Sequence, residues 1–223
     1  MPELLRVERP ADGVALLTLD RPDKRNALST ALRDEISEAL DALGADASVR
    51  CVAIAGAGPV FCAGFDLGEF QEPDPAFQER LWASSDRYHR TVLECPVPTV
   101  AGVNGPAIAG GFDLAVMCDL RVASSTATFR HPEISFGDVV YGPLHDLVGG
   151  AVARDLCLTG REIDAAEAHR VGLVSEVVAP EQALEATLAR ATAIASAPRD
   201  VLVRMKAKIA RRAGVVAGAT LDL

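Results

Sequence analysis

Apolar residues recur along this chain in two patterns, short continuous runs and helical stripes. Residues 51–55 and 97–103 are short apolar runs, which are typical of buried strands. Between residues 28 and 43, leucine or isoleucine recurs every three or four positions and predicts one face of a helix, which Gly44 ends. Strands that alternate with helices through residue 175 predict an α/β core.

The remaining pattern extends this organisation to both ends of the chain. Residues 6–8 and 14–19 flank a turn at 10–13, which is typical of a hairpin. The other predicted elements are strands over 120–123 and 127–129 and helices over 76–95, 112–118, 164–172, 181–196 and 199–213. We therefore expect a core over residues 1–175 and a helical region over residues 176–223.

One stretch, residues 104–114, joins a buried strand to a helix through two adjacent glycines. The start of a helix leaves backbone N–H groups free, and the helix dipole favours negative charge there. We therefore predict that Gly110 donates its N–H to a carbonyl oxygen that becomes negative during a reaction. The spacing alone leaves a second interpretation open, an ordinary glycine-containing helix start with Asp113 in its first turn.

Composition and charge narrow the classes of protein to which this chain can belong. Apolar residues make up 49% of the 223 residues, which is enough for a substantial core, and no apolar run has the length of a membrane span. The N-terminal residues lack the pattern of a signal peptide. Five scattered cysteines argue against a zinc site or disulfides and for a reducing cytoplasm. A net charge of −9 without a basic stripe argues against nucleic acid.

Three motifs then carry the candidate chemistry: FCAGFDL at 61–67, NGPAIAGGFDL at 104–114 and HPEISFG at 131–137. Their order and spacing resemble the crotonase superfamily, also called the enoyl-CoA hydratase/isomerase family. The segments RPDKRNAL at 21–28 and LTGREIDAAEA at 158–168 resemble further signatures of that family. The resemblance covers residues 5–210.

The resemblance implies a spiral of ββα turns, C-terminal helices that mediate assembly as a homotrimer or dimer of trimers, and an acyl-CoA substrate. It implies no metal or redox cofactor. The backbone amides of Phe65 and Gly110 would form an oxyanion hole for the thioester oxygen. Contacts with CoA and the acyl group are implied at Lys24, Arg25, Ala27, Ala63, Asp66, Leu67 and Gly111.

Hydration also needs acid–base groups, and the family's hydratases use two glutamates. Asp113 and Glu133, which are 20 residues apart, match those positions. An aspartate at the first position also resembles the dienoyl-CoA isomerases, but their further acid is replaced here by Tyr141. We therefore predict a 2-enoyl-CoA hydratase, with a double-bond isomerase and a non-catalytic acyl-CoA-binding protein as alternatives.

Four histidines and two departures from the family pattern complete the predictions. We expect His145 at the surface or at a helix start, His131 and His169 to be structural or exposed, and His89 to be a candidate for the pocket lining. The segment at 138–148 is a few residues shorter than in the family, and the closing helices are absent after residue 223. In the family, the first of these segments helps to form the acyl pocket, and the closing helices contact CoA and neighbouring subunits.

Overall fold

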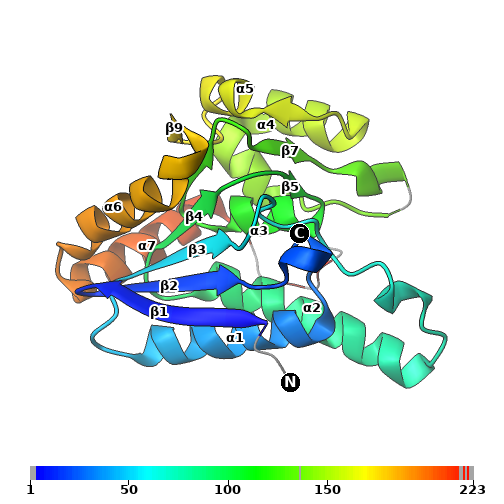
Figure 1. The fold of residues 1–223 in the computed structure, drawn as a ribbon, viewed down its shortest axis with the longest axis horizontal. Helices are drawn as coiled ribbons and strands as arrows, with labels where there is room; N and C mark the ends of the chain where they lie inside the picture. The colour runs from blue at the N-terminus through cyan, green and yellow to red at the C-terminus, as the bar shows by residue number, and fades with distance from the viewer. Residues whose placement is uncertain (1–3, 136, 216–217, 219, 221–223) are drawn as a thin grey trace.

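A six-stranded sheet organises the computed structural model, which describes residues 4–135, 137–215, 218 and 220 (Figure 1). The strands, in spatial order, are β1 (Leu5–Ala11), β2 (Val14–Leu19), β3 (Cys51–Gly56), β4 (Thr99–Val103), β6 (Leu120–Ser124) and β9 (Glu176–Val178). β1 and β2 form the predicted antiparallel hairpin, and all later neighbours are parallel. Parallel neighbours need crossover connections, and helices supply them.

In a second, three-stranded sheet, as in the first, the strands lie side by side in the order in which they occur along the chain. Its strands are β5 (Ala107–Ile108), β7 (Thr128–Arg130) and β8 (Ile163–Asp164), and a single bridge from Cys62 to Ala107 extends it. β4, β5 and α3 follow one another along the chain, as do β6, β7 and α4. This recurring strand–strand–helix unit confirms the predicted ββα spiral.

Seven helices are described, together with four short 3₁₀ turns. The helices are α1 (Thr30–Ala45), α2 (Pro75–Glu94), α3 (Gly110–Met117), α4 (Gly142–Thr159), α5 (Ala165–Arg170), α6 (Ala183–Ala195) and α7 (Arg199–Ala213). The 3₁₀ turns are η1 (Pro22–Lys24), η2 (Glu69–Gln71), η3 (Pro132–Ser135) and η4 (Pro180–Gln182). α1 begins where the Ser29 side chain accepts a hydrogen bond from Leu32 N, and α2 begins where Asp74 caps Ala76 N.

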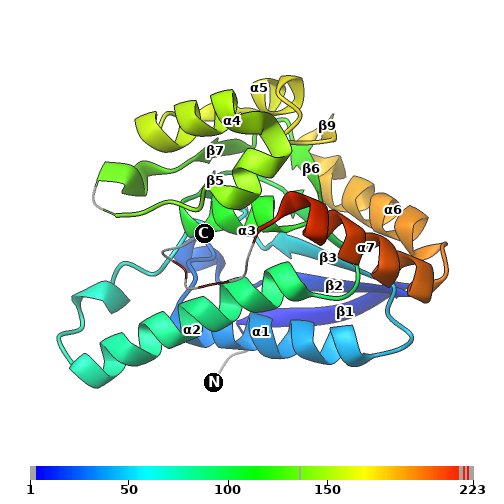
Figure 2. The ribbon, with the colours of Figure 1, turned by 180° about the vertical axis from the view of Figure 1, so that it is seen from behind.

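Both faces of the large sheet are buried, which explains why its strands are continuous apolar runs. Along β2, Leu17 and Leu19 pack in the same cluster as Leu32 of α1, whereas Leu16 packs with Ala191 of α6. α6 covers the second face, where it contacts β3, β4 and β6. In both ribbon views α1 and α2 lie together at one end of the molecule, and α4 and α5 lie at the other (Figures 1 and 2). Each leucine buried in this way stabilises the fold by roughly 1.5–3 kcal/mol.

The structure differs from the sequence prediction at α4 and at β9. The apolar pattern predicted no helix over 142–159; α4 is kinked at Gly149, whose φ of 75° interrupts the helical period. β9 pairs with β6, so the large sheet extends past residue 175 into the segment that we expected to be helical. Phe136 of the third motif and the final residues of the C-terminal region lie outside the described residues. No described helix has both the length and the apolar character needed to cross a bilayer.

Candidate active site

Backbone pairing brings the sequence motifs into adjacent rows. Ala63 N donates a hydrogen bond of 3.0 Å to Arg25 O, which joins the 21–28 segment to the first motif. Ile108 N donates a hydrogen bond of 3.0 Å to Cys62 O, which joins the first motif to the second. Segments far apart in the sequence therefore lie beside one another through main-chain contacts.

A third pairing adds the acidic motif to these rows. β5 runs parallel to β7, with Ala107 opposite Phe129, and Ala109 N donates a 3.0 Å hydrogen bond to Arg130 O. α3 begins directly after this pairing, and η3 begins directly after β7. The first turn of α3 and the turn that carries Glu133 consequently meet at one end of the small sheet.

The two amides predicted to bind an oxyanion lie on touching loops. A β-carbon built at Gly64 would be 3.1 Å from Gly110 N, and one built at Gly110 would be 2.9 Å from Phe65 Cδ1. In the part of the chain that the structure describes, neither Phe65 N nor Gly110 N donates a hydrogen bond to another group. Two such donors on neighbouring loops are the kind of group that stabilises an oxyanion.

The two predicted acids lie together, and His131 lies between them. His131 Nδ1 is 3.0 Å from Glu133 Oε1 and 3.6 Å from Asp113 Oδ1. The residues are 0%, 9% and 6% exposed, in the order His131, Glu133 and Asp113. Of the two alternatives that the sequence leaves for His131, structural or exposed, the structure excludes exposure, because the residue is fully buried. The sequence carried one signal for its position, because His131 immediately precedes the Pro-Glu pair.

Burial and mutual charge shift the protonation of this group. Burial raises the pKa of Asp113 to about 7; His131 opposes that shift, and the charge of Glu133 adds to it. Burial lowers the pKa of His131, but the hydrogen bond to Glu133 and the charges of both acids outweigh burial and raise it. Asp113 Oδ1 and Glu133 Oε2 are buried without a hydrogen-bond partner among the described residues. Each of these oxygens can accept a hydrogen bond from a small polar ligand such as water.

The same three side chains include donor atoms of the types that bind metals. One such atom from each residue lies within 4.8 Å of the other two, which among the described residues is the one group of this kind. His131 Nδ1 already donates to Glu133, so a cation bound through that atom would have to displace its proton. We interpret the group as a hydrogen-bonded acid pair.

The residues predicted to contact CoA differ in how exposed they are. Lys24, Arg25 and Leu67 are exposed, and Asp66 pairs with Arg21 at 3.1 Å. The two remaining residues of the paired loops, Ala27 and Ala63, are half-buried. These six residues therefore form one partly open edge.

Gly111 is different, because it is buried. A β-carbon there would be 2.7 Å from Cys62 Cβ and would clash with the Cys62 carbonyl oxygen. Packing alone accounts for glycine at this position.

The structure also places His89, the candidate for the pocket lining, and His145. His89 is buried with Nδ1 2.9 Å from Ser85 O, and burial lowers its pKa to about 4. Its ring centroid lies 6.0 Å from that of Phe65. His145 is exposed in the first turn of α4, as predicted.

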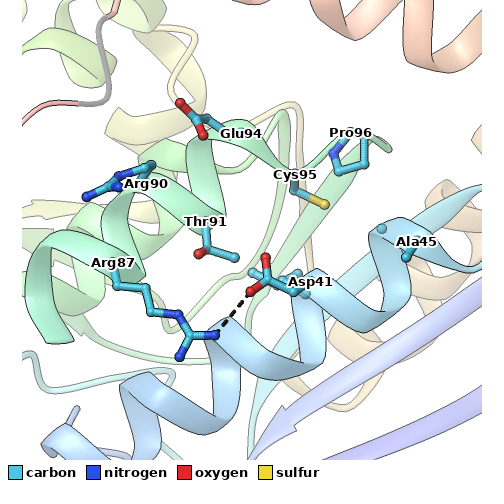
Figure 3. Close-up of a pocket in the computed structure, with 10 residues that line it drawn as sticks. Asp41, Ala45, Arg87, Arg90, Thr91, Glu94, Cys95 and Pro96 are labelled. Atoms are coloured by element: carbon cyan, nitrogen blue, oxygen red, sulfur yellow. Dashed lines mark hydrogen bonds and ion pairs between the residues drawn. The ribbon is translucent and has the colours of Figure 1, made fainter.

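A separate groove of about 490 Å³ lies between α1 and α2. Figure 3 shows Arg87 of α2 and Asp41 of α1 pointing toward one another across it, with a 3.1 Å ion pair between them. None of the predicted site residues lines this groove. The candidate chemistry therefore belongs to the paired motifs.

Comparison with known proteins gives a consistent result. Residues 9–221 match the model of the family described as enoyl-CoA hydratase/isomerase. A probable enoyl-CoA hydratase of Rhizobium meliloti is 45% identical over 188 residues, which are 82% of this chain and 72% of the relative. A probable enoyl-CoA hydratase, echA8, of Mycobacterium bovis is 38% identical over 95% of this chain and 79% of its own. The crystal structure of an enoyl-CoA hydratase from Bacillus anthracis superposes with a TM-score of 0.89 at 30% identity, covering 96% of this chain and 85% of that one.

Proposed function

Because this chain belongs to the enoyl-CoA hydratase/isomerase family, we propose that it is a 2-enoyl-CoA hydratase, which adds water across the α,β double bond of an acyl-CoA thioester. The observation that carries the proposal is the buried pair of Asp113 and Glu133, each with an unpartnered oxygen among the described residues. The amides of Phe65 and Gly110 on the adjoining loops, which donate to no other group in the described part of the chain, support it.

The proposed oxyanion hole stabilises the charge that develops on the thioester oxygen. Water attacks the β carbon, and electrons move through the α carbon to that oxygen as an enolate. The amides of Phe65 and Gly110 donate to it. Loss of one such donor typically raises the barrier by about 2.7–4 kcal/mol. Because the donors are main-chain groups, a phenylalanine side chain at position 65 is compatible with this role.

The acids move the protons. Glu133 takes a proton from the attacking water, whose oxygen bonds to the β carbon. Glu133 then gives that proton to the α carbon of the enolate, which restores the carboxylate. Asp113 orients the same water through its free oxygen. With a pKa of about 7, the Asp113 carboxyl is partly protonated near neutral pH, so it can both donate a hydrogen bond to that water and accept one from it.

We propose that the edge formed by Lys24, Arg25, Ala27, Ala63, Asp66 and Leu67 binds CoA. Lys24 and Arg25 are exposed cations, and they supply local positive charge for phosphates on a chain whose net charge is −9. The reaction consumes only water and the thioester, so we expect the rate to be unchanged by EDTA.

The test follows the loss of absorbance of the conjugated thioester of crotonyl-CoA. We expect Glu133→Gln to lower kcat by about 10²–10⁴-fold, because the amide cannot accept the proton. Glu162→Gln is the matched control, since Glu162 is half-exposed and pairs with Arg130 at 3.8 Å. Folded protein without turnover on any acyl chain length would contradict the proposal.

The isomerase alternative is separated by product analysis, because double-bond migration gives an isomer and no 3-hydroxyacyl-CoA. Aspartate at position 113 favours this alternative, whereas Tyr141, which precedes α4, does not supply the further acid. Thioester binding in calorimetry without either product would instead indicate a non-catalytic acyl-CoA-binding protein.

We further propose that the protein serves fatty acid metabolism in the cytoplasm as a homotrimer or dimer of trimers. The five cysteines are all buried and unpaired, which suits a reducing compartment. Light scattering after size-exclusion chromatography tests the assembly, and the mass of a single 23.4 kDa chain would contradict it.

A further inference from the structure

His131 is the member of the buried group to which the proposed reaction assigns no role. Its Nδ1 is 3.0 Å from one oxygen of Glu133 and 3.6 Å from one oxygen of Asp113. A carboxylate can only accept a hydrogen bond, so the imidazole is the donor to Glu133. One nitrogen thus lies within reach of both acids.

We propose that His131 is a positioning residue of the hydratase reaction, holding Glu133 through Nδ1–H and supplying the positive charge that lets both acids share one buried site. This inference rests on the proposed function. One oxygen of Glu133 is held by the imidazole, and the other, Oε2, remains free to take the proton of the water.

The groups around the pair leave this role to His131. The titratable side chains that interact with the acids from other elements are Cys62, Tyr88 of α2 and Cys157 of α4. Burial raises the pKa of Cys62 to about 12, that of Tyr88 well above 10 and that of Cys157 to about 11, so all three are neutral. Within the described residues, His131 is the one cation that acts on Asp113.

The imidazole is also fixed in orientation. Its ring stacks on Phe112 with centroids 4.5 Å apart and an interplanar angle of 27°. On the main-chain side, a β-carbon at Gly160 would be 2.9 Å from His131 O, so the two backbones are in close contact. A ring stacked on Phe112, on a backbone packed closely against Gly160, directs its hydrogen bond at one oxygen of Glu133, which is what positioning a base requires.

Two variants separate the hydrogen bond from the charge. His131→Asn keeps an N–H donor near the place of Nδ1 but has no charge, whereas His131→Leu keeps apolar bulk and loses both. We expect His131→Leu to lower kcat for crotonyl-CoA at least 100-fold with KM changed less than threefold. His131→Asn should recover at least ten-fold of that loss, while the acidic limb of its pH profile moves up by one unit or more. The control is His169→Asn, at an exposed histidine, which should leave kcat and the acidic limb of the pH profile unchanged.

A readout without turnover separates this inference from the proposed function. In imidazole ¹⁵N NMR, the signal that disappears in His131→Asn should titrate above the ordinary histidine value of about 6.5. In Glu133→Gln it should titrate at lower pH, because the acceptor has lost its charge. Equal titration in both proteins, or wild-type kinetics in folded His131→Leu, would overturn the inference. If His131→Leu does not fold, the profile of His131→Asn decides, and an unmoved acidic limb overturns it. A wild-type protein that shows this titration but no turnover would instead remove the hydratase proposal and keep the charge coupling.

Discussion

Ala109 holds a backbone conformation that alanine rarely adopts, immediately before α3. Its φ of 53° and ψ of −131° place it where an L side chain is strained by about 1–3 kcal/mol. Its carbonyl oxygen accepts hydrogen bonds from Phe112 N at 2.7 Å and Asp113 N at 3.0 Å. The turn that aims the start of α3 is therefore maintained against a local cost.

Ala109→Gly should consequently stabilise the protein. Glycine relieves the strain but loses more entropy on folding, so the expected net gain in the free energy of unfolding is about 1 kcal/mol. Urea unfolding with an unchanged m-value measures it. Ala107→Gly is the control: Ala107 is buried in β5 and has no positive φ, so the same substitution there should destabilise. A loss of stability in Ala109→Gly would show that the alanine is not strained.

At Phe65 the main-chain amide is the proposed oxyanion donor, and the side chain has a separate role. Its ring lies 4.6 Å from the Arg33 guanidinium and has centroid distances of 6.1 Å to Phe70 and 6.0 Å to His89. The ring borders the proposed oxyanion hole, whereas the donor is the amide. Phe65→Ala should therefore keep kcat for crotonyl-CoA within a few-fold and raise the relative rate with longer acyl chains. A panel of enoyl-CoA substrates measures both, and a 100-fold loss on crotonyl-CoA would contradict the separation.

At the scale of elements, the sequence predicted most of the helices and strands that have a periodic or continuous apolar pattern. α1 buries Leu32, Ile36 and Leu40 on the predicted stripe, and α7 (Arg199–Ala213) matches the predicted helix over 199–213. The two-residue strands β5 and β8 were not predicted, because two residues show no alternation. α4 was not predicted, because its kink breaks the period.

α3 packs closely against the first motif because residue 111 is a glycine. A β-carbon at Gly111 would be 2.7 Å from Cys62 Cβ, closer than real side chains approach. Gly111→Ala should push α3 from the 61–67 loop, lower stability by about 1–3 kcal/mol and lower kcat, since α3 carries Asp113. Gly137→Ala is the control, because a β-carbon there would be 3.9 Å from the nearest atom, Glu133 O. Equal stability of the two variants in urea would contradict this account of the packing.

At the scale of the whole molecule, the meeting of residues 113, 131 and 133 depends on long-range pairing. The register of β5 with β7 sets their distances, and no local pattern encodes that register. Family motifs identified the two acids as candidates, but they gave no role to His131, although it begins the third motif. Its burial and its hydrogen bond became visible only with the fold.

The buried acid pair should also make the stability of the whole molecule depend on pH. Burial raises the pKa of Asp113 from 3.8 to about 7, so between these values the folded state holds a proton that the unfolded state has released. Stability from this group is therefore lost as pH rises through that window, and Asp113→Asn removes the loss. The variant should gain stability relative to wild type by up to about 3 kcal/mol more at pH 8 than at pH 5. Urea unfolding at both pH values measures the difference, and exposed Asp138, as Asp138→Asn, should show none. An equal difference at the two pH values would mean that folding leaves the pKa of Asp113 unchanged.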